Sequence, residues 1–326
     1  MQKKAQEPLE FGPCPACEST VAQVLCESAD RLYRTTNKLF RVVECGECRL
    51  LRLDPCPPPA ELGRYYPDNY WFAPGHDTAW RLAESYRRLV LRDHVRFVRR
   101  ALAATAGEGL VLDVGCGGGL FLSLLRKPEL RVAGLDFSCD AAAVAWREKN
   151  VPVVCASLSR APFAPGSCSM VTMFHVLEHL YEPGAYLEAA HRLLQPDGRL
   201  VVQVPNAACW QFFLLGENWT GLDVPRHLFD FRARDLEPLL DASGFEVVRM
   251  KHFSLRDNPA GFATSLAPGL DPMVRRIRRI RETPRVALIK NLAYLALVAA
   301  CLPFALMEAA CHAGSTVMVE ARKKPS

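Results

Sequence analysis

Short apolar runs alternate with helix-length segments through the middle of the chain. The runs that predict strands are 110–114, 131–136, 151–154, 170–174 and 200–204. Strands separated by helices are the signature of a parallel sheet in an α/β domain. Two later apolar runs, 245–252 and 315–321, are expected to close the same sheet.

The chain before this alternation divides in two. Residues 54–59 read Asp-Pro-Cys-Pro-Pro-Pro and can continue neither a helix nor a central strand, so a boundary is expected near residue 60. Residues 78–104 place apolar side chains at mostly helical spacing among arginines, which predicts an amphipathic helix. We therefore expect four parts: a small module (1–60), a connecting segment with this helix (61–108), a main domain (109–256 and 314–322) and an insertion (257–313).

The insertion is basic and then apolar. It carries six arginines between 275 and 285, followed by sixteen uncharged, largely apolar residues from 292 to 307. Sixteen residues are short for a membrane span of about 20, and Pro303 interrupts them. We expect helices packed on the main domain. The alternatives are a peripheral membrane contact through 275–312, with arginines facing anionic headgroups beside an apolar face, or a transmembrane helix.

Composition and net charge exclude only a few classes of protein. The chain has 326 residues, of which 50% are hydrophobic and 23% are charged, which excludes a disordered or collagen-like chain and a polytopic membrane protein. The net charge of +5 is mild for this length, so no DNA partner is expected. The N-terminal residues do not contain the apolar core of a signal peptide, so we expect a reducing cytoplasm, with the membrane periphery as the alternative. Five single cysteines are expected there as small buried hydrophobes: Cys116, Cys139, Cys155, Cys168 and Cys209.

A glycine turn follows the first strand-like run. Gly115, Gly117 and Gly119 form Gly-x-Gly-x-Gly, whereas a nicotinamide-binding turn needs a third glycine one residue later. Asp113 precedes the turn, and Asp136 ends the next run, where a carboxylate can accept hydrogen bonds from both ribose hydroxyls. Acids at the turn would repel a pyrophosphate but suit a cation. The pattern favours S-adenosylmethionine, which carries a sulfonium and an ammonium and no phosphate.

With these residues the sequence resembles the class I S-adenosylmethionine-dependent methyltransferases. Residues 112–119 and 134–138 are similar to their first two motifs, and three further landmarks follow in the family's order, at 161–167, 174–180 and 194–200. The resemblance implies a Rossmann-like, seven-stranded, mostly parallel sheet with helices on both faces. It also implies contacts with the cofactor from eight residues: Asp113 near the ammonium, Gly115, Gly117 and Gly119 around the methionine and ribose, Asp136 on the ribose, Phe137 beside the adenine, Ser157 in the adenine region, and Phe174 at the pocket mouth.

Two Cys-x2-Cys turns lie in the first sixty residues. Cys14 and Cys17 form one turn, and Cys45 and Cys48 form the other. Two such turns can offer four thiolates tetrahedrally to one zinc ion, which would stabilise a module too small for a robust core. We expect a structural zinc, with reduced, unligated thiols as the alternative. The combination resembles bacterial methyltransferases with a zinc-binding module, among them sugar C-methyltransferases and enzymes of polysaccharide clusters, in which a segment like 65–72 caps the active site.

Polar and aromatic side chains gather after the fifth strand-like run, at 218–231. Ligands of open α/β sheets bind beyond the carboxyl ends of the strands. His227 could take a proton from an acceptor and Arg226 could hold its phosphate or carboxylate, with His175 at the pocket mouth as a third candidate. Similar enzymes place a histidine near the transferred methyl at the point that His227 matches. A purely structural role for His227 is the alternative.

These residues predict methyl transfer to a small molecule, namely a sugar, a nucleotide-sugar or a lipid-linked acceptor. RNA base methylation is a second hypothesis, because some RNA methyltransferases also join a zinc module to this fold. The mild charge disfavours it, as does the absence of an Asn or Asp-Pro-Pro-aromatic loop after the fourth strand-like run. The third hypothesis is an adaptor that binds S-adenosylmethionine without turnover.

Overall fold

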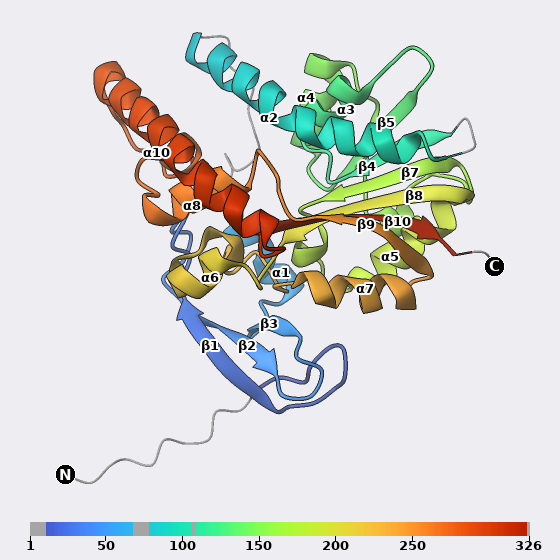
Figure 1. Ribbon diagram of the computed structural model, residues 1–326, viewed down its shortest axis with the longest axis horizontal. Coiled ribbons are helices and arrows are strands. Elements are labelled where there is room, and N and C mark those ends of the chain that lie inside the picture. The colour runs from blue at the N-terminus through green and yellow to red at the C-terminus, as the bar shows by residue number, and fades with distance from the viewer. Residues whose placement is uncertain (1–10, 68–77, 106–108, 325–326) are drawn as a thin grey trace.

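A seven-stranded sheet forms the centre of the computed structural model, which describes residues 11–67, 78–105 and 109–324, with only the backbone for 78–83 (Figure 1). The strand order is β6-β5-β4-β7-β8-β10-β9. The strands are β4 (Leu110–Val114), β5 (Arg131–Asp136), β6 (Val153–Cys155), β7 (Cys168–Phe174), β8 (Leu194–Pro205), β9 (Phe245–Lys251) and β10 (Thr316–Lys323). β10 runs antiparallel to both β8 and β9, and the other pairs are parallel. The Rossmann-like, mostly parallel sheet is thereby confirmed.

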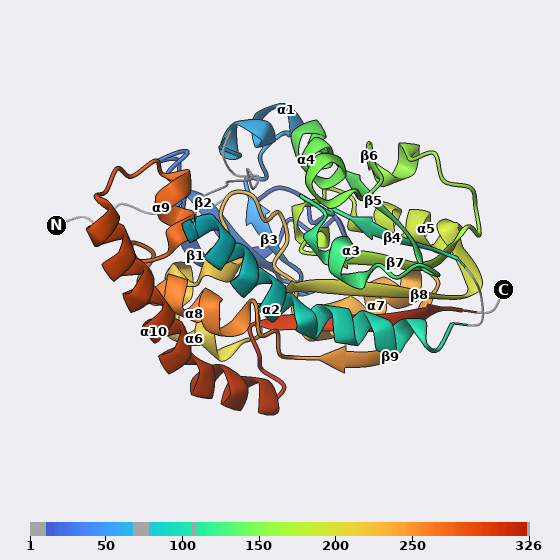
Figure 2. The ribbon, with the colours of Figure 1, turned by 90° about the horizontal axis from the view of Figure 1, so that it is seen from above.

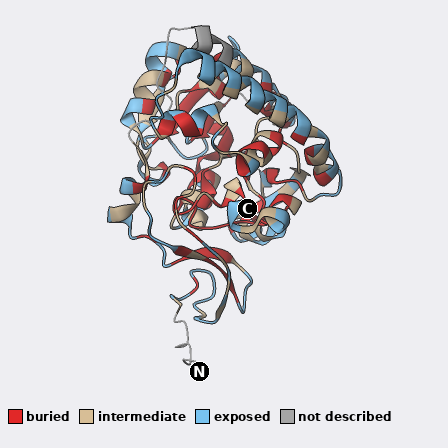
Figure 3. Ribbon diagram, turned by 90° about the vertical axis from the view of Figure 1, so that its left-hand side faces the viewer, coloured by how far each residue is buried: buried red, intermediate tan, exposed pale blue. Residues whose placement is uncertain are grey.

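Helices cover both faces of this sheet, as the alternation of apolar runs predicts (Figure 1). One face carries α2 (Thr78–Leu102), α3 (Leu120–Leu125) and α4 (Cys139–Lys149), and the other carries α5 (Pro183–Leu193) and α7 (Ala233–Ala242). Neighbouring residues of β4 divide between the two sides, because Val111 packs with the first group and Leu112 with the second. A strand that is buried on both faces reads as a continuous apolar run. Figure 3 shows the resulting buried interior.

The N-terminal module is a three-stranded antiparallel sheet. Its strands are β1 (Ala22–Ser28), β2 (Phe40–Cys45) and β3 (Leu51–Asp54), and α1 (Pro59–Leu62) follows. The module shares a hydrophobic core with the loops of the main domain, where Phe40 and Leu53 pack with Trp219 and Leu222. Leu53 also donates its backbone N–H to the Leu228 carbonyl at 3.0 Å. The module is therefore fixed to the segment that was expected to bind the acceptor.

The insertion forms helices at one end of the sheet. They are α8 (Asn258–Leu266), α9 (Pro272–Ile277) and the long α10 (Pro284–Ala310), with α6 (Trp210–Leu215) beside them. Figures 1 and 2 show α10 extending outward past the body of the main sheet. Single 3-10 turns make up the rest of the regular structure: η1 (Gly63–Tyr65), η2 (Leu158–Arg160), η3 (Leu177–His179), η4 (Gly216–Asn218) and η5 (Thr220–Leu222).

Two details depart from the expectations. Cys139 and Cys155 are exposed and form a disulfide between α4 and β6, so they are not the small buried hydrophobes that were expected. The other three single cysteines, Cys116, Cys168 and Cys209, are buried, as expected.

β8 begins six residues before the predicted strand, because the Pro-Asp-Gly stretch belongs to the strand. Most of the expected capping segment, 68–72, lies outside the described residues.

Candidate active site

The glycine loop lies where the carboxyl ends of β4, β5 and β7 meet. Gly115, Gly117 and Gly119 have φ angles between 51° and 72°, in the left-handed region that glycine adopts without steric cost. A Cβ on Gly115 would lie 2.7 Å from Val176 Cγ2, and one on Gly119 would lie 2.9 Å from Ala145 Cβ. A Cβ on Gly117 would meet none of the described residues within 4 Å. The outer glycines therefore pack the loop against the domain, and Gly117 faces open space.

Asp136 closes this loop from the end of β5. Its Oδ2 accepts the Gly117 N–H at 2.8 Å, and its Oδ1 accepts the Ser138 N–H at 2.8 Å. Burial raises the pKa of this carboxyl, and the backbone N–H groups oppose that rise by stabilising the charged form. The neighbouring Phe137 is 65% exposed. Because each carboxylate oxygen retains a lone pair and an aromatic ring lies open beside it, these residues fit the ribose and adenine of S-adenosylmethionine.

Asp113 lies inside the sheet and not on the open side of the loop. It is 3% exposed, and its Oδ1 accepts the hydroxyl of Thr172 on β7 at 2.5 Å. Burial raises the pKa of this carboxyl to about 7, against the effect of the Thr172 hydrogen bond. The proximity of Asp113 to the cofactor's ammonium group stays a prediction. The side chain ties β4 to β7 beneath the loop.

The remaining two residues expected at the cofactor lie on opposite sides of the loop. Phe174 ends β7 and packs edge-on against His94 of α2 and Phe121 of α3, with ring centroids 5.2 and 4.9 Å away. Ser157 follows β6, and its hydroxyl lies 3.2 Å from the hydroxyl of Ser159. Phe174 thus supports the helices that flank the loop, whereas Ser157 stays partly exposed at the Phe137 end.

His175 begins the turn after β7 with a φ of 56°, which is strained for a residue that is not glycine. Its Nδ1 lies 3.1 Å from Glu178 Oε1, and its Nε2 lies 2.9 Å from the amide nitrogen of Gln203. Gln203 also donates to Asp257 Oδ2 at 2.7 Å. Burial disfavours the charged ring, but the hydrogen bonds and charges of Asp257 and Glu178 outweigh it and raise the pKa of His175 to about 9. A ring contacted at both nitrogens in this way suits positioning and not proton abstraction.

Sequence reasoning missed the partners of His175, namely Glu178, Gln203 and Asp257. It also missed His94, which is fully buried, with Nε2 3.8 Å from Asp257 Oδ2 and no hydrogen bond to either ring nitrogen from the residues that the structure describes. Burial lowers the pKa of His94 to about 3, so its ring is neutral. Asp257 opens the insertion, and only the fold brings it to the end of β8. In the sequence, the one indication of a partner for His175 was the glutamate within the Phe-His-Val-Leu-Glu-His stretch.

His227 lies in a second group with His179 and Tyr66. Its Nδ1 is 2.8 Å from the Gly221 carbonyl, and because a carbonyl only accepts, Nδ1 carries the proton and Nε2 retains its lone pair. Across the described ranges, Nε2 has no hydrogen-bond partner. The ring packs edge-on against His179 at 4.7 Å, and His179 Nδ1 lies 3.1 Å from the Tyr66 hydroxyl. Burial and His179 lower the pKa of His227 to about 4, so the ring is neutral near pH 7.

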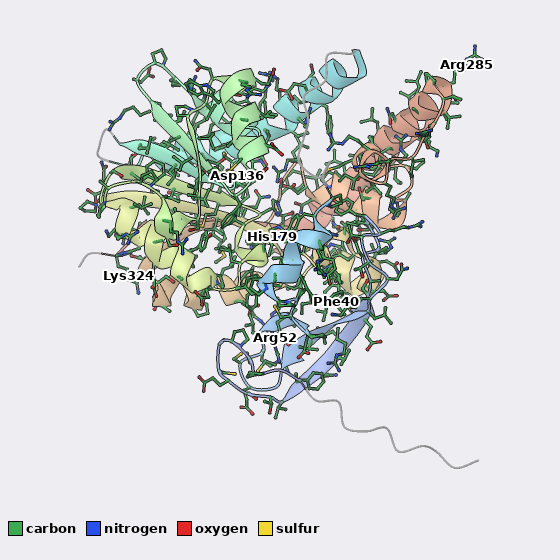
Figure 4. All side chains as sticks on the ribbon, turned by 180° about the vertical axis from the view of Figure 1, so that it is seen from behind. Phe40, Arg52, Asp136, His179, Arg285 and Lys324 are labelled. Atoms are coloured by element: carbon green, nitrogen blue, oxygen red, sulfur yellow. A yellow bond between two sulfur atoms is a disulfide. The ribbon has the colours of Figure 1, made fainter. Side chains whose placement is uncertain are left out.

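Glu178 joins the two histidine groups. One carboxylate oxygen contacts His175, and the ligand atoms of Glu178, His179 and His227 lie within 4.8 Å of one another. Figure 4 shows Asp136 and His179 toward one end of the main sheet, with Lys324 toward the other. The predicted cofactor loop and the predicted catalytic histidines are therefore brought together at one edge.

Arg226 does not take the role that the sequence suggested. It is fully buried, and all its N–H groups point to protein acceptors. These acceptors are the carboxylates of Asp30 and Asp223 and the Tyr65 carbonyl. Because no donor is left over for an acceptor's phosphate or carboxylate, the expectation that Arg226 binds the acceptor is wrong. The guanidinium instead connects the N-terminal module to the loop that carries His227.

The four predicted zinc ligands meet at one end of the N-terminal sheet. Cys14 Sγ lies 3.5 Å from Cys48 Sγ, and Cys17 Sγ lies 3.5 Å from Cys45 Sγ. All four sulfurs lie within 4.8 Å of one another. Zn–S bonds of about 2.3 Å in a tetrahedron place sulfurs roughly 3.8 Å apart. The donor set therefore fits a single zinc ion.

Comparison with known proteins identifies one matching family model, described as a methyltransferase domain, over residues 83–250. A probable S-adenosylmethionine-dependent methyltransferase of Mycolicibacterium smegmatis is 29% identical over 55% of this chain and 61% of its own length. A ubiquinone biosynthesis O-methyltransferase of Pseudomonas paraeruginosa is 32% identical over 40% of this chain and 59% of its own length. The chain thus spans about 60% of these relatives. Among solved structures, a geranyl diphosphate C-methyltransferase from Streptomyces coelicolor is 14% identical, covers 79% of this chain and 90% of its own, and has a TM-score of 0.49.

Proposed function

The chain belongs to the methyltransferase-domain family, and we propose that it transfers a methyl group from S-adenosylmethionine to a small-molecule acceptor. The observation that carries this proposal is the glycine loop closed by Asp136, with Gly117 facing open space. S-adenosylmethionine supplies an electrophilic methyl group when it is bound. The chain must then hold the cofactor, exclude water and accept the proton that the acceptor loses.

In this proposal Asp136 accepts hydrogen bonds from the ribose diol, and Phe137 packs on the adenine. Gly117 leaves room for the cofactor over the loop, because it has no side chain on that side. Phe174 and Asp113 keep the surrounding strands and helices in place. This arrangement is typical of a nucleoside site, in which one carboxylate binds the ribose and the backbone surrounds the rest of the ligand.

His227 is the proposed general base. Its Nε2 lone pair is available because Nδ1 donates to the Gly221 carbonyl, which also fixes the orientation of the ring. The pKa of about 4 keeps the imidazole neutral near pH 7, so that Nε2 carries a lone pair. His175 lies between Glu178 and Asp257 and positions the turn beside the cofactor.

The proposed acceptor is polar and carries hydroxyl groups, as a sugar, a nucleotide-sugar or a lipid-linked sugar does. Glu178 Oε2 and Asp230 Oδ1 are buried, and within the described part of the chain neither has a hydrogen-bond partner. Burial, with the charges of Glu178 and Asp223, raises the pKa of Asp230 well above its ordinary value, so that its carboxyl can donate. Buried polar atoms are almost always hydrogen-bonded. Hydroxyl groups of the acceptor would provide the hydrogen-bond partners that Glu178 Oε2 and Asp230 Oδ1 do not find in the described part of the chain.

We also propose one structural zinc ion on Cys14, Cys17, Cys45 and Cys48. The sulfur distances support it. The zinc would fix the end of the module whose sheet packs on the loop of His227, at a distance from the cofactor loop, so no catalytic step passes through it.

Calorimetry with S-adenosylhomocysteine tests the cofactor half of the proposal. Wild-type protein is expected to bind it and not to bind NADH. Asp136→Asn is expected to weaken binding at least tenfold, because the amide is a poor acceptor for two hydroxyls, whereas Asp197→Asn, on an exposed turn of β8, leaves it unchanged. Binding of NADH without S-adenosylhomocysteine would overturn the assignment. Methyl transfer from labelled S-adenosylmethionine to a panel of hydroxylated acceptors, with His227→Gln as the blank, separates an enzyme from an adaptor.

A further inference from the structure

The long helix α10 is held to the protein by its polar side chains. Tyr294 lies 2.9 Å from the Thr264 hydroxyl, and Glu308 accepts from the side chain and the backbone of Gln211 at 2.9 and 3.0 Å. Asn291 accepts from Arg275. These three positions are 3 and 14 residues apart, close to one and four helical turns, so they lie along one face of the helix.

The opposite face of α10 is apolar and open. Six large apolar side chains on it are between 42% and 66% exposed: Leu288, Ile289, Leu292, Leu295, Leu306 and Met307. On a helix at the surface of a soluble protein the outward face is ordinarily polar, and a large exposed apolar patch marks a binding surface. In α10 the outward face is instead apolar, since its hydrogen-bonding side chains point inward and these six hydrophobic side chains point outward.

Positive charge gathers at the free end of the helix. Arg279, Arg281 and Arg285 are exposed, and Figure 4 shows Arg285 at the tip, away from the body of the molecule. The nearby acid, Glu282, is already bound by Arg275 and Lys290. Two of the six arginines face inward, because Arg275 is buried and Arg278 binds the carbonyls of the N-terminal module.

The apolar surface continues onto α6. Phe213 is 88% exposed and Leu214 is 58% exposed. α6 lies beside the C-terminal half of α10, where Trp210 and Phe304 have ring centroids 6.1 Å apart. Exposed aromatic and aliphatic side chains therefore extend along the helix from its basic end into its C-terminal half.

We propose that α10, with the basic segment 279–285, binds the surface of an anionic membrane and lies in its interface. Apolar side chains beside clustered arginines match a lipid surface, in which acyl chains lie beneath negative headgroups. The 27 residues of α10 are long and apolar enough to cross a bilayer. A span does not fit because the hydrogen bonds of Tyr294 and Glu308 hold the helix to the protein over much of its length. This surface is separate from the cofactor loop, so the inference does not depend on the proposed function.

Co-sedimentation of the full chain with unilamellar vesicles tests this inference. Vesicles of phosphatidylcholine with an equal share of phosphatidylglycerol are expected to bind the protein at least tenfold more strongly than vesicles of phosphatidylcholine alone, and added salt should reduce the binding. Leu292→Asp is expected to reduce binding at least tenfold by placing a charge in the apolar face. The double variant Arg281→Glu with Arg285→Glu is expected to remove the preference for anionic vesicles.

Val248→Asp is the matched control, since Val248 is 49% exposed on β9, outside α6, α10 and segment 279–285. It should bind vesicles as wild type does, and all variants should bind S-adenosylhomocysteine equally if they are folded. Absence of wild-type binding to either vesicle would overturn the inference. So would sedimentation equilibrium showing a dimer that Leu292→Asp dissociates while vesicles bind neither form, because the apolar face would then be covered by a second copy.

Discussion

The guanidinium of Arg226 binds both carboxylate oxygens of Asp30, at 2.9 and 3.0 Å, although 196 residues separate the two in the chain. Both side chains are fully buried. Asp223 on the same loop adds a second carboxylate. The N-terminal module is therefore bonded directly to the segment that presents His227, and the two must fold together for that histidine to be placed.

Removal of Arg226 is expected to destabilise the whole chain. Arg226→Ala leaves the carboxylates of Asp30 and Asp223 without their cationic partner and should lower the free energy of unfolding by about 3–5 kcal/mol. Arg226→Lys should not restore it, because an ammonium group cannot replace the paired N–H groups of the guanidinium. Arg234→Ala, on a side chain that is 66% exposed, should change stability by less than about 0.5 kcal/mol. Urea unfolding measures all three, and a stable Arg226→Lys protein with only a raised KM would restore a direct role in acceptor binding.

Replacing glycine by alanine is expected to have different effects at two positions of the glycine loop: on stability at Gly119 and on ligand binding at Gly117. Gly119→Ala combines a left-handed backbone with a Cβ 2.9 Å from that of Ala145, so it should lower the unfolding temperature more than Gly117→Ala does. Gly117→Ala should cost only about 1–2 kcal/mol of backbone strain, yet it should weaken binding of S-adenosylhomocysteine because the new methyl group enters the open space above the loop. Thermal unfolding and calorimetry on both variants check this. Equal cofactor affinity in wild type and Gly117→Ala would argue against a ligand at that position.

Burial of His227 predicts a pH dependence of stability. Its pKa is lowered from 6.5 to about 4 in the folded chain, mainly by burial, so the unfolded chain binds the proton more readily and stability falls as the pH drops from about 6.5 through 4. A shift of this size corresponds to about 3 kcal/mol. His227→Gln should remove that part of the loss, which urea unfolding at pH 7 and pH 4 would show. If wild type and variant lose the same stability over this interval, His227 is solvated and its assignment as a neutral base is undermined.

Removal of the metal is expected to destabilise the N-terminal module. One zinc ion per chain is expected by elemental analysis of the purified protein, and a chelator should lower the unfolding temperature because metal binding contributes to folding in small modules. Cys45→Ser is expected to lose the metal and reproduce the chelator's effect. Cys56→Ser, on an exposed free cysteine outside the cluster, should retain both metal and stability. A metal-free protein that is as stable as the metal-bound one would exclude the structural role.

Local sequence determined the strands and the loop that joins them. Both β4 and β5 have the bounds that the apolar runs predicted, 110–114 and 131–136, because a strand covered by helices on both faces is apolar throughout and ends where glycine or a polar residue begins. The glycine spacing and Asp136 likewise lie within one strand-helix-strand unit (β4, α3 and β5), so their meeting needs no distant partner.

Tertiary structure decided everything that depends on residues far apart in the chain. Arg226 became a structural link because Asp30 lies opposite it, and His175 became a positioned ring because Asp257 and Glu178 flank it. Sequence also predicted an apolar helix near the C-terminus, but not that its apolar side faces outward, since periodicity records which residues share a face and not what covers that face. The charge of a buried group and the exposure of a helix face depend on neighbours, and only the packed fold supplies those neighbours.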